Sequence, residues 1–93
     1  MDERALYKEK LDYDLTKRMD DLDNYEPLKV IIQTEDGLTD ADHTLMKSLG
    51  GKIKDNLYII NAYSADVNVQ GIKKMLLSPR ILKIFNDANV SAI

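Results

Sequence analysis

The sequence predicts an α+β domain in which a four-stranded antiparallel sheet is covered on one face by two helices. After Pro27, strand-type and helix-type apolar patterns follow one another in the order strand, helix, strand, strand, helix, strand. Gly50-Gly51 and Ser78-Pro79 separate these patterns, as residues that end regular elements do. The 93 residues allow a single domain, and the absence of cysteine excludes disulfides and thiolate chemistry.

Residues 1–26 are predicted to form an acidic helical extension that precedes the main domain. They carry nine Asp and Glu against five Lys and Arg, whereas residues 27–93 carry seven against eight. Apolar residues recur every three or four positions and make one narrow stripe, namely Tyr7, Leu11, Leu15, Met19 and Leu22. Asp12 could instead cap a shorter helix that begins at Tyr13. The extension is expected either to lie on the main domain or in solvent, or else to dimerise or dock with a partner.

The first strand is expected at Leu28–Gln33, where β-branched residues dominate. A turn at 35–37 leads to Thr39, which can cap a helix together with Asp42 in an acidic form of the capping box. Gly50-Gly51 ends this helix. Its buried face is predicted to consist of Ala41, Leu45, Met46 and Leu49. His43 lies off this face and is expected to be solvated.

A hairpin is expected next, with one strand over Lys52–Ile60 and the other over Tyr63–Val67. Asn61-Ala62 supplies the turn, since Asn tolerates left-handed backbone geometry. Asn68 can cap a second helix, which Gly71 weakens by about 1 kcal/mol relative to Ala. The buried residues of this helix are predicted to be Val69, Ile72, Met75 and Leu76. The last strand is expected at Ile81–Phe85.

This order is that of the split βαβ, or ferredoxin-like, arrangement, in a domain that spans residues 27–93. Right-handed crossovers place the first and third strands in the middle of the sheet. Both helices then lie on one face, and the other face stays uncovered. In so small a domain, an uncovered sheet face is a natural docking surface.

The residues give no sign of an enzyme, a metal site or a cofactor. A catalytic triad would need His43, and the serines lack the surroundings of a nucleophile elbow. Gly50-Gly51 ends a helix and so cannot cradle phosphate. The net charge of −3 disfavours nucleic acid, and no apolar run reaches the roughly 18–20 residues that span a membrane. No signal peptide or small-molecule site is expected. Protein binding is therefore the favoured function.

Four short motifs resemble the propeptides of subtilisin-like serine proteases. They are the opening strand PLKVIIQ (27–33), the helix end and turn SLGGKIK (48–54), the hairpin IINAYSA (59–65) and the strand entry SPRI (78–81). Together they cover residues 27–93 in the order typical of that family. The resemblance implies a non-catalytic domain that helps its protease to fold and then inhibits it temporarily. It also implies secretion as part of a precursor.

The resemblance further implies which residues bind the protease. The uncovered sheet face would pack on two protease helices, with Tyr63 and Phe85 as its aromatic residues. Asp87 and, as a second candidate, Asp66 would cap the N-termini of those helices. Within a C-terminal inhibitory tail at 88–93, the cleft-binding residues would be Val90, Ser91, Ala92 and Ile93. Ile93 would fill the first specificity pocket and Val90 the fourth.

Two alternatives remain open at this stage. The chain could be a free-standing inhibitor of subtilisin-type proteases, which a catalytic domain encoded directly after Ile93 would exclude. It could also be a ferredoxin-like regulatory or ligand-binding domain with an oligomerising helix, because this fold serves many functions. Saturable binding of a small molecule without any protease inhibition would select that second alternative.

Overall fold

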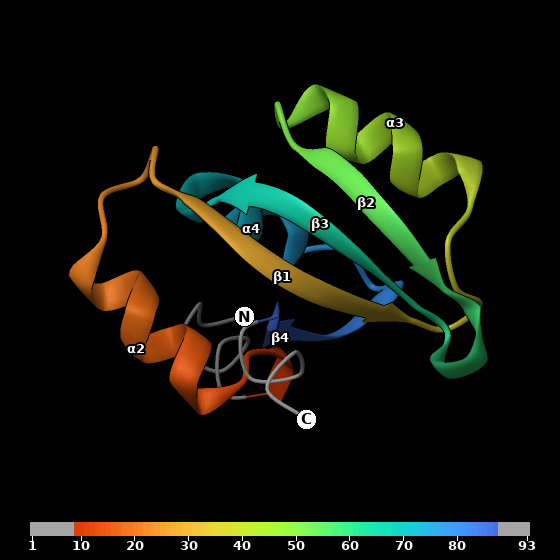
Figure 1. Ribbon diagram of the computed structural model, residues 1–93, viewed down its shortest axis with the longest axis horizontal. Helices are drawn as coiled ribbons and strands as arrows, with labels where there is room; N and C mark the ends of the chain where they lie inside the picture. Colours follow the sequence, from red (N-terminus) through yellow and green to blue (C-terminus); the bar gives the residue numbers. More distant parts are fainter. Residues whose placement is uncertain (1–8, 88–93) are drawn as a thin grey trace.

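A computed structural model describes residues 9–87 and confirms the predicted order of elements (Figure 1). The helices and strands are α2 (Tyr13–Asp21), β1 (Pro27–Thr34), α3 (Asp40–Ser48), β2 (Lys52–Leu57), the 3₁₀ turn η1 (Tyr58–Ile60), β3 (Ala62–Asn68), α4 (Val69–Met75) and β4 (Ile81–Asn86). Within residues 9–87, no helix has the length and apolar character needed to cross a membrane.

The four strands form one antiparallel sheet in the order β2-β3-β1-β4, so β1 and β3 are central as predicted. Helices α3 and α4 cover the same face of this sheet (Figure 1). This is the ferredoxin-like split βαβ arrangement. Two short crossovers, each containing one helix, produce it.

The inward face of the sheet is set by alternation along each strand. On β1, Val30 and Ile32 point toward the helices and are fully buried. Their partners on β3, Ala65 and Tyr63, are buried with them. The core cluster is completed by residues of α2, α3 and α4, by further residues of β1 and β3, and by β4, including Leu15, Met19, Leu28, Met46, Val67, Val69, Ile72, Met75, Leu76, Ile81 and Ile84.

The acidic N-terminal segment shares this core. Leu15 and Met19 of α2 are buried in the same cluster as β1 and α4. Lys10 Nζ donates hydrogen bonds of 2.9 Å to two backbone carbonyls just after α4, and Leu11 pairs in parallel with Ile84 of β4. The helix starts at Tyr13, so the shorter of the two predicted helices is the one that forms. Residues 1–8 lie outside the described part of the chain.

The hairpin differs from its prediction at one point. Strand β2 ends at Leu57, three residues before the predicted end, and Tyr58–Ile60 form a 3₁₀ turn. Asn61 follows with φ 53° and ψ 47°, the left-handed geometry expected for it. The turn therefore takes up four residues, including three apolar ones that the sequence pattern had suggested were strand.

Helix α3 is turned slightly from the predicted orientation. Ala41 is exposed, whereas Asp42 is only 1% exposed, so the prediction of a buried Ala41 is wrong. The capping box is confirmed, because the Thr39 N–H donates to Asp42 Oδ2 at 2.9 Å. His43 is exposed, as predicted. The buried carboxylate of Asp42 forms an ion pair with a cation from a different part of the chain.

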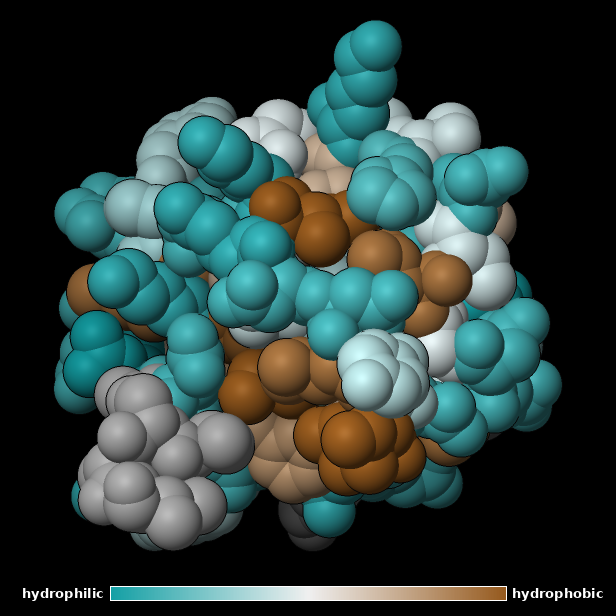
Figure 2. Space-filling model, turned by 45° about the vertical axis from the view of Figure 1, so that its right-hand side comes forward, coloured by the Kyte–Doolittle hydropathy of each residue, from teal (hydrophilic) through white to brown (hydrophobic). Residues whose placement is uncertain are grey.

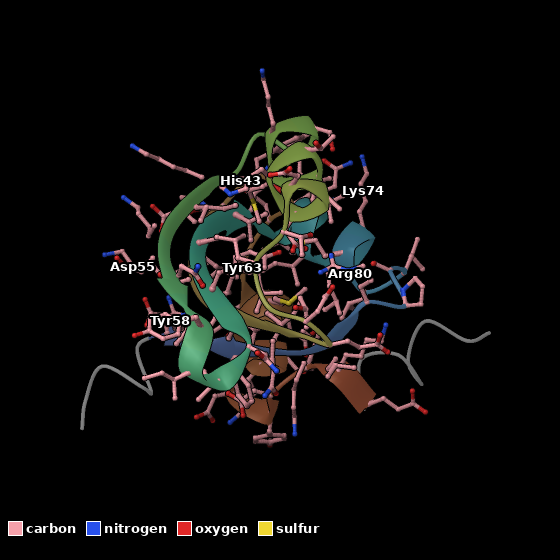
Figure 3. The ribbon with its side chains drawn as sticks, turned by 90° about the vertical axis from the view of Figure 1, so that its right-hand side faces the viewer. His43, Asp55, Tyr58, Tyr63, Lys74 and Arg80 are labelled. Carbon is pink, nitrogen blue, oxygen red and sulfur yellow. The ribbon has the colours of Figure 1, made fainter. Side chains whose placement is uncertain are left out.

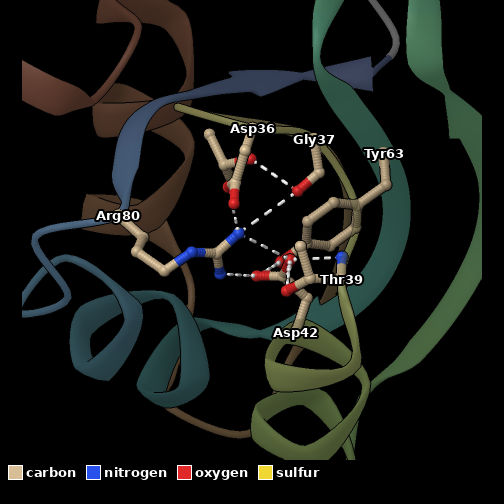
Figure 4. A network of polar contacts seen from close by, with 7 residues as sticks. Asp36, Gly37, Thr39, Asp42, Tyr63 and Arg80 are labelled. Atoms are coloured by element: carbon tan, nitrogen blue, oxygen red, sulfur yellow. Dashed lines mark hydrogen bonds and ion pairs between the residues drawn. The ribbon is translucent and has the colours of Figure 1, made fainter.

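That cation is Arg80, which enters from the loop between α4 and β4 (Figure 4). Its Nη1 donates to Asp42 Oδ1 at 2.8 Å, and its Nη2 donates to Asp36 Oδ1 at 2.6 Å and to the Gly37 carbonyl at 3.3 Å. The Tyr63 hydroxyl donates to Asp42 Oδ1 at 3.4 Å. The network thus connects the loop before α3, α3 itself, β3 and the loop before β4.

The network also changes the proton affinity of its members. Burial alone would raise the pKa of Asp42, but the hydrogen bonds from Arg80 and Thr39 outweigh burial and lower it. Burial raises the pKa of Tyr63, and the nearby Asp42 charge adds to the increase. Asp42 is therefore ionised at neutral pH, and Tyr63 remains a hydrogen-bond donor.

Gly71 should resist replacement by alanine although it lies within α4. Asn68 caps this helix by accepting a hydrogen bond from the Gly71 N–H at 2.7 Å. A Cβ on residue 71 would lie 2.6 Å from Val67 Cγ2 and 3.1 Å from Asn68 Oδ1. Overpacking costs about 1–3 kcal/mol, which exceeds the gain of about 1 kcal/mol in helix propensity.

We therefore expect Gly71→Ala to lower the free energy of unfolding by about 1 kcal/mol, as measured by urea denaturation. Gln70→Ala, one residue away on the exposed side of α4, is the matched control and should change stability by less than about 0.5 kcal/mol. A stabilised Gly71→Ala protein would contradict the close packing described here.

Candidate functional site: the open sheet face and the hairpin turn

The face of the sheet opposite α3 and α4 carries no helix within the described residues (Figure 1). We call it the open face. By strand alternation and register it is formed by Lys29, Ile31 and Gln33 of β1, Ala62, Ser64 and Asp66 of β3, and Lys83 and Phe85 of β4. The prediction of two helices on one face and none on the other is confirmed for residues 9–87.

The centre of the open face is apolar but shallow. Ile31 is opposite Ser64 on one side and Phe85 on the other, and it is only 3% exposed. Phe85 is partly exposed, and the ammonium of Lys83 lies 5.7 Å from the centre of its ring. Two lysines, one aspartate and uncharged polar side chains surround this centre. A partner that packs here would therefore meet the exposed part of Phe85 inside a rim that carries both signs of charge.

Only one of the two aromatic residues predicted for docking lies on this face. Phe85 is on the open face, as expected. Tyr63 has no exposed surface and points to the opposite side, where its hydroxyl reaches Asp42 of α3. The proposed docking role of Tyr63 is wrong, because the residue is part of the core.

The two candidate helix-capping carboxylates lie at the same end of the sheet. Asp66 is opposite Lys29 on β1, and Asp87 directly follows Asn86, which is opposite Val30. Asp66 forms an ion pair of 3.3 Å with Lys54 of β2. The register therefore brings both residues to the end of the sheet where β1 begins. The predicted tail residues, from Val90 to Ile93, lie outside the described part of the chain.

Three consecutive exposed apolar residues lie beside the open face, at the turn after β2. Tyr58, Ile59 and Ile60 are 72%, 84% and 52% exposed. With Leu57 and Asn56 they line a hollow of about 370 Å³, and an apolar patch is visible low on this side of the molecule (Figure 2). We call residues 57–60 the apolar turn. Single exposed apolar residues are ordinary, but a contiguous group indicates a binding surface.

One hydrogen bond attaches the apolar turn to the open face. Gln33 Nε2, which belongs to that face, donates to the Ile60 carbonyl at 3.2 Å. The Thr34 N–H also donates to the Asn61 carbonyl at 2.9 Å. The apolar turn and the open face are thus adjoining parts of one surface. The sequence predicted the sheet part of this surface but not the turn.

A sequence signal for the apolar turn does exist. Four apolar residues precede Asn61 without a break, whereas hairpin turns are usually built from polar residues and glycine. The same run favours strand by its β-branched residues, and that signal dominated the prediction. No protein-family model and no curated protein matches this chain.

Proposed function

We propose that this chain is a protease-binding domain of the propeptide type, which docks on a subtilisin-like serine protease through the open face and the apolar turn. The observation that carries the proposal is the sheet face that no helix of residues 9–87 covers, joined to a group of strongly exposed apolar side chains at Tyr58–Ile60. Burial of one such side chain contributes roughly 1.5–3 kcal/mol. The four motifs in the sequence direct the proposal to this class of protease.

In the proposed complex, the sheet binds the surface of the protease and the segment after the sheet binds its substrate cleft. Phe85 and the apolar turn pack on the protease surface, and Asp66 and Asp87 lie where they can cap helix N-termini of the partner. The residues that follow β4, from Val90 to Ile93, enter the substrate cleft. The domain itself performs no catalysis, and it needs neither a metal nor a cofactor for this role. We further propose that it is secreted with its protease.

The same contacts account for assisted folding. A domain that binds the native protease and not the unfolded chain stabilises the native state by mass action. While both parts belong to one polypeptide, their effective concentration is high, so docking can accelerate a slow β-rich topology. A free-standing inhibitor of the same fold would use the same surface without the covalent connection.

Inhibition of a subtilisin is the direct test. The full chain, titrated against the protease during hydrolysis of a chromogenic peptide, should slow the reaction at micromolar concentration. Ile59→Asp should weaken inhibition by about tenfold or more, because it removes an exposed isoleucine from the contact and adds a charge. Since Ile59 is 84% exposed, the variant should remain as stable as the parent.

One control and one further test variant separate the contribution of the apolar turn from that of the tail. Leu77→Asp changes an equally apolar residue that is 69% exposed after α4 and should inhibit like the parent. Ile93→Asp should also weaken inhibition, since it would place a charge in an apolar pocket. Failure of the full chain to inhibit at micromolar concentration would overturn the proposed function. Equal loss in Leu77→Asp and Ile59→Asp would overturn the assignment of the apolar turn.

A further inference from the structure

A second surface lies on the other side of the hairpin, between β2 and α3. Because the strand order is β2-β3-β1-β4, strand β2 pairs with β3 alone among the strands of residues 9–87 and has an outer edge there. A groove of about 590 Å³ runs between this strand and α3. In Figure 3, His43 on α3 and Asp55 on β2 belong to its two walls. A groove with an edge strand on one side and a helix on the other can receive an extended peptide.

The floor of the groove is apolar, and its rim carries lysines. Leu38, Met46 and Ile53 supply its apolar residues. Met46 belongs to the core cluster, and Leu38 and Ile53 pack against it. The lysines of the rim are Lys47 from α3 and Lys52 and Lys54 from β2, all of them exposed.

The groove is therefore positive on a chain whose net charge is −3. Asp55 is the single carboxylate that lines it within the described residues, and Asp66 of the neighbouring strand pairs with Lys54 at 3.3 Å. The three lysines therefore exceed the carboxylates beside them by one. This excess of positive charge favours an acidic partner. An apolar floor with a basic rim fits a segment in which apolar and acidic residues alternate, since side chains of a strand point to opposite sides in turn.

We propose that the outer edge of β2 binds an acidic extended peptide segment as a fifth strand. The peptide backbone pairs with the outer N–H and C=O groups of β2. Its apolar side chains enter the groove toward Met46 and Ile53, and its acidic side chains face Lys52 and Lys54. This site adjoins the open face, because Lys54 pairs there with Asp66 at 3.3 Å. Its own contacts are the outer edge of β2 and the groove, which the proposed protease binding does not use.

The test uses the full chain and a fluorescently labelled, acetylated peptide of sequence EVELEVE. We expect saturable binding in fluorescence anisotropy, with backbone amide shifts in NMR spectra concentrated in β2 and α3. A peptide of the same sequence with alternate amides N-methylated should bind at least about tenfold more weakly, because it cannot complete the strand ladder. The basic peptide KVKLKVK should not bind.

Charge reversal supplies the matched comparison. Lys52→Glu combined with Lys54→Glu should weaken EVELEVE binding by about tenfold, since each exposed ion pair contributes modestly. Lys83→Glu combined with Lys74→Glu makes the same change in net charge outside the groove, with Lys83 on β4 at the opposite edge of the sheet, and should alter binding by less than about twofold.

The inference is wrong if the peptide does not saturate at millimolar concentration, or if N-methylation has no effect. It is also wrong if both double variants weaken binding equally, or if the shifts map to the open face.

Discussion

Replacement of Arg80 by methionine should lower the free energy of unfolding by about 3–5 kcal/mol at pH 7. The variant keeps a side chain of similar length but removes the guanidinium that pairs with Asp42. Asp42 is only 1% exposed, so its carboxylate would remain charged and desolvated without that cation. Since small domains are stable by roughly 5–15 kcal/mol in total, urea denaturation followed by circular dichroism should show a large shift.

The difference in stability between parent and variant should also depend on pH, which a simple loss of packing would not cause. In the parent, the lowered pKa of Asp42 means that its contribution to stability is present above the unfolded value of about 3.9 and is lost as pH falls through the lower folded value. Without Arg80, burial, which raises the pKa of Asp42, is opposed by the hydrogen bonds from Thr39 alone among the causes named above, so this pKa is higher than in the parent. The Arg80→Met protein should therefore recover stability relative to the parent as pH falls toward 4.

Two further variants control for other effects of the substitution. Arg80→Lys retains a positive charge but not the paired donors, so it should lose less stability than Arg80→Met. Asp42→Asn added to Arg80→Met should restore part of the loss, because it removes the unpaired buried charge. If this double variant is no more stable than the single one, the charge of Asp42 is not the cause.

Replacement of Leu15 by alanine should cost about 2–5 kcal/mol, although the residue lies in the acidic segment before the main domain. Leu15 has no exposed surface and belongs to the same core cluster as β1 and α4. Thermal and urea denaturation should both show one cooperative transition at a lower midpoint.

The matched control for this prediction is Tyr13→Ala, two residues earlier in the same helix. Tyr13 is 73% exposed, so its replacement should change the free energy of unfolding by less than about 0.5 kcal/mol. If Leu15→Ala costs no more than Tyr13→Ala, helix α2 contributes nothing to the stability of the sheet domain.

Much of the fold could be predicted because local signals agree with it. Asn68 and the pair Thr39 and Asp42 cap helices where their hydrogen-bonding groups suggested. Asn61 takes the left-handed geometry that ends the hairpin turn. With the strands and helices in order, handedness leaves few alternatives for the sheet.

The site was harder to predict because it depends on register and on distant partners. Tyr63 shares a face with Ala65 and Val67, and that face proved to be the core side. A shift of one residue along a strand reverses this assignment. Asp42 is buried because Arg80, 38 residues later, reaches it. No local sequence pattern predicts a pair so distant along the chain. The buried face of α3 therefore includes Asp42, and not Ala41 as predicted.

The parallel pairing of Leu11 with Ile84 has a consequence for aggregation. The two outer strands of an open sheet are places where copies of a protein can add to one another without limit. Here the Asp12 N–H donates to the Ile84 carbonyl at 3.1 Å, so the N-terminal segment occupies part of the β4 edge. Unlimited growth needs two complementary edges on each molecule, whereas joining through β2 alone closes after two copies. The segment before α2 thus acts against fibre formation.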